Sequence, residues 1–102
     1  MKLETYEITH RALTVAGMPV AQARDLMSIL TLLRLDGARY SADIGEEYIS
    51  IVILCEHQEL ASGATHLAKP WIKVGHVVST KVKGSEDTYL YSVSYTIPLK
   101  PV

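Results

Sequence analysis

The segment from Pro19 to Leu35 has an apolar surface that is too wide for a helix packed on one side of a sheet. Proline suits the first position of a helix, where its missing N–H costs nothing, and Gly37 follows as a left-handed cap. A packed helix needs an apolar arc of only about 100°. The polar residues here occupy a narrow arc: Arg24, Asp25, Ser28 and Thr31. The pattern therefore predicts a long helix, with either a sheet that curls around it or a second copy that covers the excess.

A hairpin is expected directly after this helix. Ala38 to Ile44 and Tyr48 to Cys55 are rich in strand-forming residues and flank a turn at 45–47. The second segment, YISIVILC, is apolar on both faces. Such a pattern is typical of a central strand that is covered on both sides or by a subunit contact.

A second hairpin gives the clearest strand pattern in the chain. Its strands, 72–83 and 88–97, flank a four-residue connection suited to a hairpin loop. A pairing counted back from this connection sets His76 opposite Tyr95 in an otherwise apolar row and leaves the other face polar. We therefore expect a buried histidine that donates a hydrogen bond to the tyrosine hydroxyl.

The remaining segments complete the predicted fold. Leu3 to Val15, rich in Thr, Tyr, Ile and Val, predicts a first strand, while 56–70 fits either a strand end or a helical turn. The order of elements predicts a single α+β domain over 1–102, in which one long apolar helix at about 19–35 packs on a mainly antiparallel sheet of about five strands. A chain of 102 residues can hold a core without disulfides.

The amino-acid composition indicates where the protein is located and whether it binds a cofactor. Cys55 is the only cysteine, so no intrachain disulfide can form, and the N-terminus lacks the apolar core of a signal peptide. No apolar run approaches about 18 residues, the length of a membrane span. The six glycines are isolated and form no phosphate loop. We therefore expect a cytoplasmic protein without a membrane segment or a cofactor.

The charges are distributed unevenly along the chain. Residues 1–60 hold nine acidic and five basic groups, whereas 61–102 hold five lysines and two acidic groups. Lysines and tyrosines gather near the tip of the second hairpin, which is long enough to outrun the predicted helix. This composition favours a surface that binds an acidic protein partner, although solvated lysines that protect a sheet edge are the alternative. The predicted partner-binding residues are Lys81, Lys83, Tyr89, Leu90 and Tyr91, together with Trp71.

Candidate catalytic groups are few. A buried imidazole beside a phenol can act as a general base or a proton switch, which makes His76 a candidate, but a core histidine bonded to Tyr95 is the simpler interpretation. Asp25 is the acidic residue within the long helix. No catalytic residue is therefore assigned, with His76 and Asp25 kept as alternatives.

The residues from Cys55 onward include possible metal ligands. Cys55, His57 and Glu59 would project to one side of an extended strand, and His66 or His76 could complete their ligand set. No zinc-type spacing accompanies them, so a buried cysteine followed by polar residues at a strand end is favoured. We therefore predict no metal site.

These features favour a small non-enzymatic protein–protein interaction module, homodimeric, that acts as a regulator or inhibitor by docking on a larger complex. An apolar helix followed by long antiparallel strands is also similar to the hotdog arrangement, which implies an acyl-thioester hydrolase acting through Asp25 or His76. A single-stranded nucleic-acid binder that stacks bases on Trp71 and tyrosines is less favoured, because the net charge is -1 and the first half of the chain is acidic.

Overall fold

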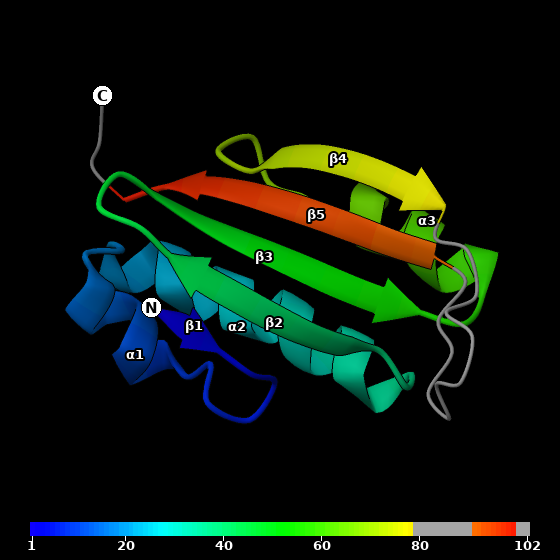
Figure 1. The fold of residues 1–102 in the computed structure, drawn as a ribbon, viewed down its shortest axis with the longest axis horizontal. Coiled ribbons are helices and arrows are strands. Elements are labelled where there is room, and N and C mark those ends of the chain that lie inside the picture. Colours follow the sequence, from blue (N-terminus) through cyan, green and yellow to red (C-terminus); the bar gives the residue numbers. More distant parts are fainter. Residues whose placement is uncertain (79–90, 100–102) are drawn as a thin grey trace.

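The computed structural model describes residues 1–78 and 91–99, and this part of the chain forms three helices and five strands (Figure 1). Five antiparallel strands form one sheet in the order β1-β2-β3-β5-β4. The class is α+β, as the sequence predicts. In chain order the elements are β1 (Lys2–Leu3), α1 (His10–Ala16), α2 (Val20–Leu35), β2 (Arg39–Ile44), β3 (Tyr48–Cys55), α3 (Gln58–His66), β4 (Lys73–Val78) and β5 (Tyr91–Pro98).

The first predicted strand is wrong over most of its length. Only Lys2–Leu3 pairs with β2, and α1 occupies the later part of the segment. Local capping explains the difference: the Thr9 side chain accepts a hydrogen bond from the Ala12 N–H, and Gly17 ends the helix with φ 116°. These caps outweigh the strand propensity of the threonine and valine residues in the segment.

The long predicted helix is present as α2, but it is one of three helices in the described chain. Figure 1 shows α2 and α3 behind the sheet, with α1 beside α2. α1 and α3 both contact α2 and cover part of its apolar surface, for which the sequence analysis expects a curled sheet or a second copy. Val20, Leu32 and Leu35 remain exposed on α2. The ambiguous segment 56–70 holds α3, which seats the buried Ala61 and Ala64 against the sheet.

The first predicted hairpin is confirmed, with β3 at the centre of the sheet. Alternate residues of β3 are buried beneath the helices: Ile49, Ile51, Ile53 and Cys55. None of the described helices covers the opposite face of the sheet (Figure 1). Most side chains on this face are short. The strand pairing aligns them in three rows across the sheet: Asp43, Ser50, Thr96 and Lys73; Ser41, Val52, Ser94 and Gly75; and Arg39, Leu54 and Ser92.

The second hairpin forms with a register that differs by two residues from the predicted one. His76 pairs with Val93, and Tyr95 pairs with Val74. An even shift leaves each side chain on its predicted face, but β4 is an edge strand and His76 is exposed. The Tyr95 hydroxyl donates to the Ala64 carbonyl of α3 instead. The predicted bond between His76 and Tyr95 is therefore wrong.

Candidate functional site

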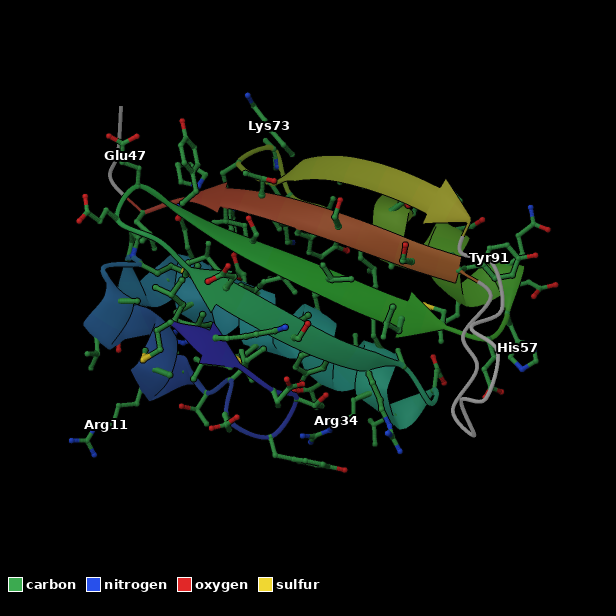
Figure 2. The ribbon with its side chains drawn as sticks, viewed as in Figure 1. Arg11, Arg34, Glu47, His57, Lys73 and Tyr91 are labelled. Carbon is green, nitrogen blue, oxygen red and sulfur yellow. The ribbon has the colours of Figure 1, made fainter. Side chains whose placement is uncertain are left out.

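A pocket of about 480 Å³ opens between the loop that follows β1 and the turn that joins α2 to β2. The loop contributes Glu4, Thr5 and Tyr6, and the other wall consists of Arg34, Gly37, Ala38 and Arg39. Figure 2 shows Arg34 at the end of α2, next to this loop. The pocket combines two guanidinium groups and a phenol ring, with the Glu4 carboxylate as the opposing charge.

Thr5 fixes the loop wall of the pocket. Its hydroxyl donates to the Tyr40 carbonyl at 2.7 Å and accepts from the Tyr40 N–H at 3.1 Å. Leu3 pairs with Ala42, so Thr5 meets the β2 backbone two residues further along, where β1 has already ended. The Thr5 side chain therefore pairs the N–H and the carbonyl of Tyr40 at this edge of β2, where both groups would otherwise have no hydrogen-bond partner.

Tyr6 and Arg34 form the exposed rim of the pocket. Tyr6 is 82% exposed, and the Arg34 guanidinium lies over its ring at 5.5 Å from the centroid. A cation at this distance is attracted by the ring face. Arg34 also lies in the last turn of α2, where a positive charge interacts favourably with the helix dipole. Tyrosine and arginine are both enriched among the residues that contribute most to binding at protein interfaces.

The Tyr40 hydroxyl lies beneath this rim. Tyr40 is 2% exposed, and within the described chain its hydroxyl meets no partner with hydrogen-bond geometry. Burial raises its pKa above the usual value of 10, and the nearby Arg34 guanidinium opposes part of this effect. Arg34 thus lies close enough to act electrostatically on Tyr6 at the rim of the pocket and on the buried Tyr40 nearby.

Gly37 shapes the other wall. Its φ is 96°, in the left-handed region that favours glycine, and an added Cβ would meet nothing within 4 Å. The left-handed backbone conformation, rather than a lack of space for a side chain, therefore explains why glycine occupies position 37. The turn carries the chain from Arg34 on the helix to Arg39 on the strand, which brings both arginines to one pocket.

Most of the predicted partner-binding residues lie outside the described part of the chain, namely Lys81, Lys83, Tyr89 and Leu90. Tyr91 and Trp71 are described, and both are half-buried against the core. Tyr91 begins β5 opposite Cys55, whereas Trp71 precedes β4 at the other end of the sheet. The structure therefore does not bring these two aromatic residues together.

The alternative catalytic residues lie on separate elements. Asp25 is exposed on α2, and His76 is exposed on β4. The row of Cys55, His57 and Glu59 does not form, because the chain leaves the strand at Cys55 and enters α3.

The predicted ligand set and the Cys55 thiol can be compared with the structure. In residues 1–78 and 91–99, no group of three or more His, Cys, Asp or Glu could hold a metal ion. Burial raises the pKa of the Cys55 thiol, which disfavours the reactive thiolate. None of the described helices has the length and apolar character needed to cross a membrane.

The sequence interpretation missed the pocket formed by Tyr6 and Arg34. The sequence pattern places Tyr6 in a predicted strand and Arg34 near the end of the predicted helix, and the β1–β2 pairing and the Gly37 turn bring them together. Exposed tyrosines are not marked by sequence periodicity, so the available signal was limited to the glycine after the helix. Comparison with family models, with curated proteins and with solved structures finds no match for this chain.

Proposed function

We propose that this chain is a small non-enzymatic protein-interaction module that acts as a regulator or inhibitor by docking on a larger protein complex. The observation that carries the proposal is the pairing of an exposed Tyr6 with Arg34 at the rim of a pocket. Tyrosine and arginine dominate binding energy at protein interfaces because they combine large contact area with hydrogen bonding.

The chemistry of the pocket supports an acidic group on the partner. A carboxylate can accept paired hydrogen bonds from a guanidinium, and Arg34 and Arg39 line the same pocket. Glu4 on the loop wall disfavours a partner with several negative charges at this point. A single Asp or Glu side chain beside an apolar residue that packs on the Tyr6 ring would fit best.

The predicted hairpin surface can belong to the same docking region. The register places Val78 and Tyr91, the described ends of β4 and β5, at the end of the sheet where β2 begins at Arg39. Figure 2 shows Tyr91 at this end, opposite Glu47. Lys81, Lys83, Tyr89 and Leu90 lie outside the described residues and are kept in the proposed partner surface on their composition alone, while Trp71 lies at the other end of the sheet.

Affinity capture with the full chain tests the proposal. The bait is compared with a Tyr6→Ala, Arg34→Ala double variant and with Tyr48→Ala, which removes an exposed tyrosine at the opposite end of the sheet. We expect the parent and Tyr48→Ala to enrich the same protein, and the double variant to lose it while its circular dichroism stays unchanged. Equal capture by all three baits would exclude the pocket as the docking site.

A further inference from the structure

The last turn of α3 and the edge strand β4 place two histidines at one pocket. The pocket measures about 450 Å³ and is lined by Ser62, Thr65, His66 and His76. The three residues of α3 share one side of the helix, because they are spaced by three and four positions. His76 lies opposite Val93, which is buried under the helices, so its side chain also projects to the helix side of the sheet.

Packing and hydrogen bonding position the helix end and the strand that carry the two histidines. The Tyr95 hydroxyl donates to the Ala64 carbonyl and ties α3 to β5 two residues before His66. Tyr95 also pairs with Val74, which precedes His76 by two residues on the same face of β4. Ala61 and Ala64 are buried and small, so α3 lies close to the sheet. Figure 1 shows α3 behind the end of β4.

The side chains of this pocket select among metal ions. Neutral imidazole nitrogens are good ligands for Zn²⁺, Ni²⁺ and Cu²⁺, whereas Mg²⁺ and Ca²⁺ require carboxylate or carbonyl oxygens. Among the described residues, no carboxylate lines this pocket. The Thr65 hydroxyl already donates to the Ala61 carbonyl, which leaves Ser62 as the other nearby oxygen.

We propose that His66 and His76 bind a divalent transition-metal ion of the Zn²⁺ type, with the other coordination positions open to solvent. The described residues supply two imidazoles and no third His, Cys, Asp or Glu ligand. The bound ion is therefore exchangeable rather than a structural centre, since structural zinc sites use four protein ligands. Affinity should follow the order Cu²⁺ above Ni²⁺ and Zn²⁺, with Mn²⁺ weakest.

Calorimetric titration of the full chain with Zn²⁺ alone tests this site. Loss of a partner in the second coordination shell already costs about 10- to 100-fold in metal affinity, so His66→Gln and His76→Gln should each cost at least about tenfold. His10→Gln and His57→Gln are the matched controls and should leave the affinity unchanged, because both lie elsewhere on the surface.

A measurement on the unaltered chain removes any dependence on the variants. Traces of Cu²⁺ should broaden the imidazole proton resonances of His66 and His76 before those of His10 and His57. The proposal is overturned if Zn²⁺ at millimolar concentration gives no heat of binding, if the control variants lose the affinity instead, or if Cu²⁺ broadens all four histidines together. Partner capture through Tyr6 and Arg34 is unaffected by any of these outcomes.

Discussion

Thr5 uses its side chain where a neighbouring strand would use its backbone. Replacing it with valine keeps the shape but leaves the Tyr40 N–H and carbonyl without partners. Unpaired buried groups cost about 1 to 3 kcal/mol each, so Thr5→Val should lower the free energy of unfolding by at least about 1 kcal/mol. Thr5→Ser retains the hydroxyl and should lose less. Urea unfolding followed by Trp71 fluorescence compares them, and equal midpoints for Val and Ser would contradict this role.

Tyr40 and Tyr95 are buried tyrosines whose hydroxyl groups differ in hydrogen bonding. Among the described residues the Tyr40 hydroxyl has no partner with hydrogen-bond geometry, although Arg34 lies near enough to lower its pKa. Tyr95 is fully buried and donates to the Ala64 carbonyl, and burial followed by the Cys55 interaction raises its pKa to about 12. Tyr95→Phe should therefore lower the free energy of unfolding by about 1 to 3 kcal/mol, whereas Tyr40→Phe should lower it by less. Thermal melts of both variants compare the two losses of stability, and a larger loss in Tyr40→Phe than in Tyr95→Phe would contradict the prediction.

The pKa of Tyr95 also predicts a pH dependence. Its folded pKa of about 12 exceeds the ordinary value of 10, so the folded state holds this proton more tightly than the unfolded state does. The corresponding stability is complete below pH 10 and is lost as the pH rises from 10 to about 12. Urea midpoints across this range should fall less steeply in Tyr95→Phe than in the parent. Parallel curves for the two proteins would argue against the shifted pKa.

At the scale of elements, two glycines should respond in opposite directions to alanine. Gly37 has a φ of 96°, which costs an alanine about 1 to 2 kcal/mol. Gly63 lies within α3 with open space around its Cβ position, so alanine there should stabilise by about 0.5 to 1 kcal/mol through its helix propensity. Chemical unfolding measures both changes. A stabilising Gly37→Ala would mean that the turn readily changes its conformation.

The elements that the sequence predicts best are those with strong periodicity and clear breaks. Pro19 and Gly37 bracket α2, and the apolar run of β3 indicates a central strand, of which one face is buried. The sequence analysis does not predict α1, because the segment is rich in strand-forming residues and the helix depends on its caps at Thr9 and Gly17. Alternation in β4 and β5 fixes only which face a residue takes, so a register displaced by two fits it equally well.

The candidate site depends on contacts that lie between elements. Tyr6 and Arg34 are far apart in sequence, and neither residue type carries a signal that it will meet the other. The same holds for His66 and His76, which share a pocket only because the Tyr95 hydroxyl anchors α3 beside β4. Local patterns in a sequence specify elements, whereas these sites require the packing of one element on another.

For the whole molecule, the distribution of uncovered apolar residues determines how copies can associate. Leu32 and Leu35 are 54% and 75% exposed near the end of α2 and are neighbours on the helix surface. Val20 is exposed at the start of the helix, but the polar residues Arg24 and Ser28 separate it from the two leucines. On the open face of the sheet, Val52 is only 37% exposed and is surrounded by serines. The leucine pair at the end of α2 is therefore the better surface for a second copy, because burial of apolar area drives association.

We predict that the chain forms a dimer of about 23 kDa, twice its mass of 11.3 kDa, through the exposed Leu32 and Leu35 of α2. Leu32→Gln with Leu35→Gln removes two apolar side chains from this surface and retains helix propensity, so it should shift the protein to a monomer without unfolding it. Val15→Gln is the matched control, since Val15 is equally exposed but lies on α1. Sedimentation velocity at micromolar concentration distinguishes the species. A parent that sediments only at 11 kDa would rule out the dimer, and a double variant that stays dimeric while Val52→Lys becomes monomeric would move the interface to the open sheet face.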